Sequence, residues 1–483
     1  MSVREQVPFA GASPAGSSSC SVLIPKYFIP HGTTGSSAEY RTGGETMYSN
    51  RHRPETCFRS QAAPESGILA IRRIATFSLF LFVLVGGAAQ GQTFQVLHSF
   101  TGGADGSGPL AGVTIDARGN LYGTTTGGGS NCIYGSCGTV YRLTPKGSSW
   151  VLTPIYTFAG SDGATPNGGV IQDASGALYG TTAAGGAFNG GVAFKLTPSA
   201  TASPTALSHW NEEVLHEFDT YRGGPLDTLI FDSTGSLYGT TYGGGTYGGG
   251  TVFKLTPSEQ GWAETVLYNF TGSEDGRGPV AGVVFDAAGN LFGTTVRGGP
   301  YSECGTVFQL TPGTSGWTET VLYNFTGLGD GCLPYAGVVV GSSGHLYGAL
   351  AATDYSGCRG GACPGVIFEL PRRSDGLWYT FAPGGRGGCR DADGSGPQDV
   401  LTMDASGALY GTTAGEGAHG FGNVFKLTPS SDGWTYSSLY DFTGGVDGYE
   451  ACSRVTFDRA GNLYGTASYG GAYGYGVVWK IAP

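Results

Sequence analysis

Short apolar segments that alternate with polar or small residues follow one another along most of this chain. The alternation is strict in segments that open with Trp and close with Tyr/His-x-Phe, such as Trp262 to Phe270, and this pattern predicts half-buried strands. The segments return in the same order, each time with Leu-Tyr-Gly or a one-letter variant among them. Its copies begin at Leu121, Leu178, Leu237, Leu291, Leu346, Leu409 and Leu463, which lie 54 to 63 residues apart. Self-similarity at a nearly fixed period indicates a repeat architecture.

Each repeat is expected to hold four strands. The first is a short apolar strand that ends in Asp, such as Gly282–Asp286, and a tight Ala-x-Gly-Asn turn follows it. The Leu-Tyr-Gly-Thr-Thr strand comes second. A glycine-rich loop leads to the third strand, such as Gly250–Pro257, whose closing Pro we take to mark the strand end because it has no N–H to donate. The fourth is the segment that opens with Trp.

Seven repeats of four strands predict an all-β fold, a seven-bladed β-propeller of four-stranded blades. The chain ends at Pro483 after a third strand, so the last blade lacks its fourth. Residues 93–100 read as a fourth strand without a blade of its own. We therefore predict that this N-terminal strand completes the last blade and closes the ring, which would also remove two exposed sheet edges.

The first ninety residues do not share this pattern. Residues 1–66 lack strand or helix periodicity and are predicted to be a disordered or mis-assigned extension. Residues 67–91 contain Arg72-Arg73, an apolar run over 74–85 and then small residues, which is typical of a signal peptide. The predicted domains are thus 1–66, 67–91 and the propeller over 92–483. We expect a secreted or periplasmic protein with no stable membrane insertion after cleavage; an uncleaved N-terminal anchor is the alternative.

The composition agrees with many short strands joined by tight turns, since 89 residues are Gly and 12% are aromatic. The net charge of −11 argues against nucleic acid as a partner, because phosphate binding needs clustered Lys and Arg. We expect a monomer.

The strings Gly119–Thr125 and Gly250–Pro257 resemble the repeats of the GloVer tandem-repeat family of secreted bacterial proteins. The resemblance covers Thr93 to Pro483 and implies export and a repeat fold. It brings no catalytic residues to carry across. Members of the family are similar in having variable C-terminal anchoring tails, whereas this chain ends at Pro483.

All eight cysteines of the predicted mature chain lie in loops expected on one face of the propeller, which we call the loop-rich face. In an exported protein an even number of cysteines predicts disulfides, whose connectivity the sequence does not fix. A zinc site is the alternative, without paired histidines to support it. The cysteines are Cys132 and Cys137 in one loop, Cys358 and Cys363 in another, Cys304 and Cys332 in consecutive loops, and Cys389 and Cys452 in adjacent inter-blade loops.

The same face is predicted to carry an aromatic residue in each loop between second and third strands. Such rings would stack on sugars or on an apolar partner, or else each would pack on the neighbouring blade. They are Tyr134, Phe188, Tyr247, Tyr301, Tyr355, Phe421 and Tyr473.

The loops between blades repeat an Asp-Gly motif, for which turn formation is the simplest explanation. One copy, with Asp391 and Asp393, suggests calcium weakly, because a full calcium loop needs more oxygen ligands. No other cofactor is expected.

Three charged residues replace small ones where the first strands begin, near the expected mouth of the central channel: Asp227, Asp399 and Arg454. They are the candidate catalytic residues of a carbohydrate-active hydrolase or lyase, or a salt-bridged structural plug. Because the repeats are otherwise so alike, we favour an exported, non-enzymatic protein that binds a glycan or protein partner through the loop-rich face. The fifth copy, Leu346–Leu350, departs furthest from the repeat and is the first place to look for a specialised blade.

Overall fold

The structure is a computed structural model that describes residues 92–129, 132, 136–199, 210–219, 223–300, 303–327, 330–352, 365–371, 379–381, 395–431 and 433–483. The predicted extension over 1–66 and the predicted signal peptide over 67–91 lie outside these residues. Within the described ranges there is no helix long and apolar enough to cross a membrane.

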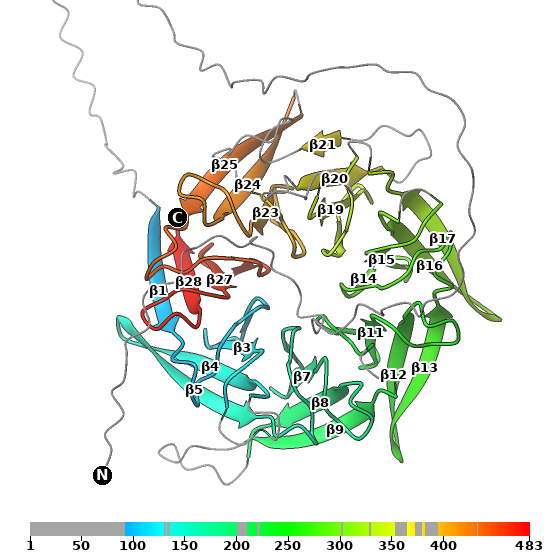
Figure 1. Ribbon diagram of the computed structural model, residues 1–483, viewed down its shortest axis with the longest axis horizontal. Helices are drawn as coiled ribbons and strands as arrows, with labels where there is room; N and C mark the ends of the chain where they lie inside the picture. Colours follow the sequence, from blue (N-terminus) through cyan, green and yellow to red (C-terminus); the bar gives the residue numbers. More distant parts are fainter. Residues whose placement is uncertain are drawn as a thin grey trace, which may run out of the picture. The chain divides into compact units, whose positions relative to one another are not determined.

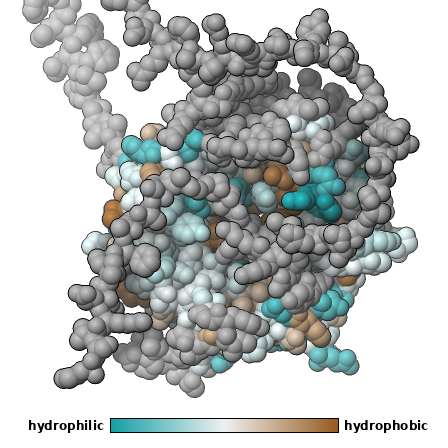
Figure 2. All heavy atoms as spheres, viewed as in Figure 1, coloured by the Kyte–Doolittle hydropathy of each residue, from teal (hydrophilic) through white to brown (hydrophobic). Residues whose placement is uncertain are grey.

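The described residues form seven four-stranded antiparallel sheets, arranged around a centre as the blades of a propeller (Figure 1). The predicted seven-bladed β-propeller is therefore confirmed. In six blades the strands follow chain order from the inside outwards. Figure 2 shows that, where described residues are visible on this face, hydrophobic and hydrophilic ones are interspersed.

The strand bounds, blade by blade, are these. Blade 1 is β2 (Thr114–Ile115), β3 (Leu121–Thr125), β4 (Thr139–Lys146) and β5 (Ser149–Thr157), and blade 2 is β6 (Ile171–Gln172), β7 (Leu178–Thr181), β8 (Val192–Thr197) and β9 (Asn211–Glu217). Blade 3 is β10 (Ile230–Phe231), β11 (Leu237–Thr241), β12 (Thr251–Ser258) and β13 (Gly261–Asn269), and blade 4 is β14 (Val284–Phe285), β15 (Leu291–Thr295), β16 (Thr306–Gly313) and β17 (Gly316–Asn324). Blade 5 is β18 (Val338–Val340), β19 (Leu346–Leu350), β20 (Val366–Leu370) and β21 (Tyr379–Phe381), and blade 6 is β22 (Thr402–Met403), β23 (Leu409–Thr412), β24 (Asn423–Ser430) and β25 (Gly433–Asp441). Blade 7 is β26 (Thr456–Phe457), β27 (Leu463–Ala467), β28 (Val477–Ala482) and β1 (Thr93–Ser99).

The ring closes as the sequence predicts. β1 pairs antiparallel with β28, from Thr93 opposite Ala482 to Ser99 opposite Val477, with one bulge between Val96 and His98. The first strand of the described chain and its last one thus share a sheet (Figure 1). The pairing leaves β28 without a free edge.

Two details of the predicted strands are wrong. The first strand of each blade is only two or three residues long, so a prediction such as Gly282–Asp286 shrinks to β14. The closing Pro also does not always end the third strand. In β12, Pro257 lies opposite Trp262 and the ladder continues to Ser258, because Pro257 sits beside the turn of the hairpin, where one missing donor costs little.

The Leu-Tyr-Gly-Thr motif holds neighbouring blades together, as blade 2 illustrates. The Tyr179 ring packs edge-on against Trp262 of the next blade, with centroids 6.2 Å apart. Gly180 lies opposite Phe194, and a Cβ at Gly180 would come within 2.6 Å of that ring. The Thr181 hydroxyl donates to the backbone carbonyl of Asp227 in blade 3, at 3.0 Å. The motif is therefore a scaffold, with glycine required so that an aromatic ring can lie against the second strand.

The hairpin after each first strand is organised by its Asp. In blade 3 the Asp232 carboxylate accepts from the N–H groups of Thr234 and Ser236, and from the Tyr238 hydroxyl at 3.1 Å. Burial opposes ionisation, but these hydrogen bonds lower the pKa of Asp232 to about 2. Lys254 lies 3.4 Å from the same carboxylate.

Blade 5 departs from this arrangement by exchanging charges. Gly341 stands where the other blades have the hairpin Asp, and Glu369 stands where blade 3 has Lys254. The Glu369 carboxylate accepts a hydrogen bond from the Tyr347 hydroxyl at 3.0 Å. The same carboxylate oxygen lies 2.7 Å from Nδ1 of the His345 ring. In blade 5 the acidic residue therefore lies on the third strand and not in the hairpin, and the Tyr347 hydroxyl still donates to a carboxylate.

Candidate functional site: the central channel and the loop-rich face

The first strands and the residues before them line a central cavity of about 680 Å³. Most of its wall is apolar, with Leu110, Leu226 and Val280 among the lining residues. An apolar cavity of this size with a few polar groups is typical of small-molecule pockets.

Asp227 and Asp399 occupy the same repeat position, in blades 3 and 6, and both line the cavity. One Asp227 oxygen accepts from the N–H of Thr228 at 2.6 Å, and the other accepts from the N–H of Gly282, in blade 4, at 2.7 Å. The Asp399 carboxylate repeats this geometry, accepting from the N–H of Val400 at 2.6 Å and from the backbone N–H of Arg454 in blade 7. Each acid therefore joins its blade to the next one.

The two acids also influence each other. Burial, followed by the negative charge of Asp227, raises the pKa of Asp399 to about 7, and the nearby Arg454 opposes the shift. Asp399 is partly exposed to the cavity, so water there weakens this effect. Arg454 is exposed, and its Nε lies 3.5 Å from the Thr402 hydroxyl. None of the ion pairs within the described ranges joins Arg454 to either acid, although Asp399 accepts from the backbone N–H of Arg454.

Two amides beside these acids were missed by the sequence analysis. Asn167 and Gln398 stand one residue before the position of Asp227, where blades 1, 3 and 4 have Leu110, Leu226 and Val280. The side-chain Oδ1 and Nδ2 of Asn167 and the Oε1 of Gln398 are buried without a hydrogen-bond partner. Comparing this position between repeats would have found them, because a polar residue among aliphatic ones is the same signal that singled out the acids.

The predicted aromatic residues fall into two groups. Phe188, Tyr247 and Tyr473 stand three residues before the glycine that opens the third strand, and are 55%, 63% and 62% exposed. Phe421 instead lies against Gly444 of the following inter-blade loop, 6.0 Å from the Tyr449 ring, and so packs on its neighbour. Tyr134, Tyr301 and Tyr355 lie outside the described residues.

A stacked aromatic pair on blade 7 was not predicted. The rings of Tyr449 and Tyr469 are 5.5 Å apart and 17° from parallel, on two loops that pair by a β-bridge. Tyr469 is exposed. The loops of blades 6 and 7 thus carry four aromatic residues, this pair together with Phe421 and Tyr473.

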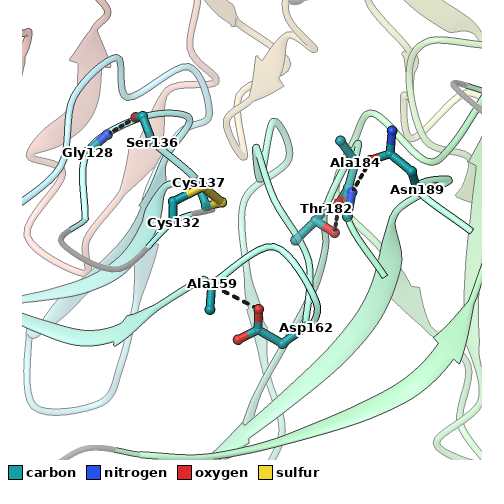
Figure 3. Close-up of a disulfide and its surroundings, with 10 residues drawn as sticks. Gly128, Cys132, Ser136, Cys137, Ala159, Asp162, Thr182, Ala184 and Asn189 are labelled. Atoms are coloured by element: carbon teal, nitrogen blue, oxygen red, sulfur yellow. Dashed lines mark hydrogen bonds between the residues drawn. A yellow bond between two sulfur atoms is a disulfide. The ribbon is translucent and has the colours of Figure 1, made fainter. Parts of the chain in front are cut away.

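The prediction of disulfides is confirmed for the described cysteines. Cys132 and Cys137 are bonded within one loop, beside a hydrogen bond of 2.6 Å from Gly128 to the Ser136 hydroxyl (Figure 3). Cys304 and Cys332 join consecutive loops. Cys452 is also disulfide-bonded. The remaining candidates, Cys358, Cys363 and Cys389, lie outside the described residues.

The repeated Asp-Gly loops are turns closed by protein donors. In one copy the Asp275 carboxylate accepts from the N–H and hydroxyl of Thr271 and from the Tyr268 hydroxyl. The copy with Asp391 and Asp393 lies outside the described residues. Within those residues no group of three or more His, Cys, Asp or Glu is placed to hold a metal ion.

Two glutamates on fourth strands, Glu212 on β9 and Glu319 on β17, lie near an acid of the preceding inter-blade loop and make the stability of the fold depend on pH. Burial, reinforced by Asp162 for Glu212 and by Asp275 for Glu319, raises the pKa of each to about 7. One carboxylate oxygen of each is buried without a partner. Because the pKa of each glutamate is higher in the folded protein than in the unfolded chain, the fold favours the protonated side chain. The fold has its full stability below about pH 4.5, where both states are protonated, and loses part of it as pH rises through about 7 and the buried carboxyl groups ionise.

We expect Glu212→Gln and Glu319→Gln to stabilise the fold at pH 8 by about 1 kcal/mol each, a value reduced from the full pKa shift because both side chains are partly solvated. At pH 4.5 the gain should vanish. Urea unfolding at the two pH values measures it. Glu259→Gln is the control, since Glu259 lies exposed in the turn between β12 and β13 and has no burial to relieve. An equal gain at both pH values would contradict the prediction.

Comparison with known proteins places the chain in a repeat family. The family model of the Gloeobacter/Verrucomicrobia repeat matches residues 83–214, 206–388 and 364–483. Curated protein sequences contain no match. Among solved structures, a crystal structure from Bacteroides uniformis, provisionally described as a 6-phosphogluconolactonase, is 14% identical with a TM-score of 0.42, over 68% of this chain and 84% of that one. The matched repeats span the propeller, and the chain belongs to the Gloeobacter/Verrucomicrobia repeat family.

Proposed function

We propose that this protein is an exported, non-enzymatic binding protein that holds a glycan on its loop-rich face. The observation that carries the proposal is the exposure of Phe188, Tyr247 and Tyr473 at one loop position of three blades. These aromatic rings are exposed to water at matched positions, which is unfavourable, and they do not pack in the core. They suit stacking on the apolar faces of sugar rings. The stacked pair Tyr449 and Tyr469 extends this surface on blade 7.

Export is supported by the cysteines. Cys132 with Cys137 and Cys304 with Cys332 are bonded, and the described residues include no free cysteine. Structural disulfides of this kind persist in oxidising compartments. The loops that they restrain belong to the same face as the exposed rings.

Replacing Phe188, Tyr247 and Tyr473 together by Ala is expected to weaken glycan binding at least tenfold, since each stacked ring contributes about 0.5–1.5 kcal/mol. A glycan array with the wild-type protein would identify the ligand, and titration with that glycan measures the loss. Val446→Ala, which removes an apolar side chain that is 72% exposed, is the control. All variants should keep their melting temperature. Unchanged affinity in the triple variant, or capture of proteins alone, would count against glycan recognition.

A carbohydrate-active hydrolase or lyase is the second candidate, favoured by one observation. The raised pKa of Asp399 beside Asp227 resembles the separated acid and base of such enzymes. Against it, two backbone N–H groups hold each carboxylate. Polysaccharide turnover that Asp399→Asn abolishes would reverse this ranking.

A further inference from the structure

A short antiparallel bridge on the loop-rich face connects the inter-blade loop of a blade to the loop between its second and third strands. In blades 1, 2, 5 and 6 the bridge joins small residues: Ser107 with Gly127, Ala164 with Ala184, Cys332 with Ala352, and Ser395 with Gly415. Blade 7 has Tyr449 opposite Tyr469 there, and blade 4 has Arg277 opposite Arg297. Blade 4 therefore departs from the repeat by placing two positive charges across one bridge.

The two arginine side chains project from the same side of this bridge. The N–H of Arg277 donates to the carbonyl of Arg297 at 2.7 Å, and the N–H of Arg297 donates to the carbonyl of Arg277 at 3.1 Å. Residues opposed in this way have neighbouring side chains on one face, and the tyrosine rings at the same bridge of blade 7 are 5.5 Å apart. Like charges directly opposite each other destabilise such a pair, so the two arginines cost stability in the free protein.

One acid among the described residues partners this pair, and it partners Arg277. The Glu303 carboxylate contacts Nη2 of Arg277. Glu303 has a φ of 58°, a left-handed conformation for which blades 3 and 7 use glycine, at Gly248 and Gly474. A glutamate is strained in this conformation, and here its carboxylate holds Arg277 in place. Arg297 is exposed, and none of the ion pairs of the described ranges includes it.

The pair keeps accessible surface and positive charge for a ligand. The side chain of Arg277 is 43% exposed even with Glu303 against it. Asp275 of the same loop is buried and its carboxylate accepts hydrogen bonds within the turn, while Glu274 is exposed and, among the described residues, pairs with neither arginine. The net charge of −11 acts weakly here, because exposed charges beyond about 10 Å are largely screened at 0.1 M salt.

An aromatic ring of the proposed glycan surface lies on the neighbouring loop. The N–H of Gly278, which follows Arg277, donates to the carbonyl of Gly249 at 2.8 Å. Gly249 belongs to the blade 3 loop that carries Tyr247, whose side chain is 63% exposed. The loop with the arginine and the loop with the exposed ring are therefore joined directly.

We propose that Arg277 and Arg297 bind an anionic substituent, a carboxylate or a sulfate, on the glycan that the loop-rich face holds; the inference rests on the proposed function and narrows its ligand to an acidic glycan. A guanidinium group offers N–H donors in a planar fork that matches such an oxyanion. An anion between the two arginines also relieves the repulsion across the bridge. The adjoining sugar ring then stacks on Tyr247.

A glycan array of uronate-bearing, sulfated and neutral oligosaccharides, probed with the full protein, tests the proposal. Acidic glycans should be preferred, and the uronate and sulfated arms identify the substituent. Titration with the tightest acidic glycan should give a Kd at least tenfold lower than with its methyl-esterified or desulfated form. Arg277→Gln and Arg297→Gln should each weaken the acidic glycan at least tenfold, whereas Arg459→Gln, in the exposed hairpin after β26 on the opposite face, should leave its Kd unchanged.

The melting temperature separates binding from structure. Arg297→Gln should not lower it, because the substitution removes a like-charge contact, and raising the salt from about 50 mM to about 500 mM should weaken acidic glycans in the wild type more than in this variant. Equal affinity for charged and neutral forms, or full affinity in both arginine variants, would overturn the inference. Neutral glycans bound alone and lost in the triple aromatic variant would leave the proposed function standing without it. No glycan binding at all would overturn both.

Discussion

Deleting residues 93–100 is expected to abolish cooperative folding of the propeller at ordinary temperature. The segment carries β1 and Phe100, whose side chains pack in two clusters of the core. Phe94 stacks on Tyr440 of blade 6 at 3.6 Å, and Phe100 meets Tyr141 of blade 1 at 5.2 Å. The strand therefore binds blade 7 to both of its neighbours.

The expected size follows from burial. Each large apolar side chain that is withdrawn from water contributes about 1.5–3 kcal/mol, and the segment supplies Phe94, Val96, Leu97 and Phe100. A typical domain is stable by only about 5–15 kcal/mol, so this loss removes most of the margin. The deletion also opens the edge of β28, which invites association between molecules.

Circular dichroism and size-exclusion chromatography of the deletion variant measure the effect. A synthetic peptide of residues 92–101 should restore the folded monomer by strand addition, and a scrambled peptide of the same composition should not. A deletion variant that unfolds cooperatively with wild-type stability would show that ring closure contributes little.

The ring closure could be predicted because it depends on strand order alone. The chain ends after a third strand and the repeats begin with a spare fourth, and this offset identifies the partner of β28 without any knowledge of side-chain contacts. The number of blades follows in the same way from counting copies of one motif. Repeats make such predictions strong, since each blade sees only its neighbours.

Contacts that cross between blades could not be predicted so directly. That Asp227 accepts from the N–H of Gly282 depends on the angle between blades 3 and 4, which no spacing encodes. The exchange of charges in blade 5 is similar. Gly341 and Glu369 are 28 residues apart in sequence, and only the register of Tyr347 opposite Glu369 shows that one compensates for the other. The sequence marked blade 5 as different without giving the reason.

The residues at the channel show both what the repeat pattern reveals and what it leaves hidden. Asp227, Asp399 and Arg454 were found because they break a repeated pattern, and the structure places all three at the cavity. Asn167 and Gln398 break the pattern too, but amides attract less attention than charges. Their significance comes from burial without a partner, which is a property of the folded chain.

Phe270→Ala is expected to cost about 3–5 kcal/mol, as for other fully buried phenylalanines. Phe270 follows the fourth strand of blade 3, is 0% exposed, and meets Phe308 of blade 4 edge-to-face at 5.1 Å. The same contact recurs between other blades, as in Phe158 with Phe194 at 5.1 Å. Truncating either ring leaves a cavity in the seam between two blades, where rigid sheets cannot collapse to fill it.

Urea unfolding measures this cost, and Val266→Ala on β13 is the control because Val266 is 40% exposed. A double-mutant cycle with Phe308→Ala should give a coupling of about 0.5–1.5 kcal/mol for the ring pair. Because the seams are built alike, Phe158→Ala should cost nearly as much as Phe270→Ala. A cost below about 1 kcal/mol at both sites would mean that the blades are held by their backbone and polar contacts, such as the Thr181 hydroxyl on the Asp227 carbonyl, and not by the aromatic pairs.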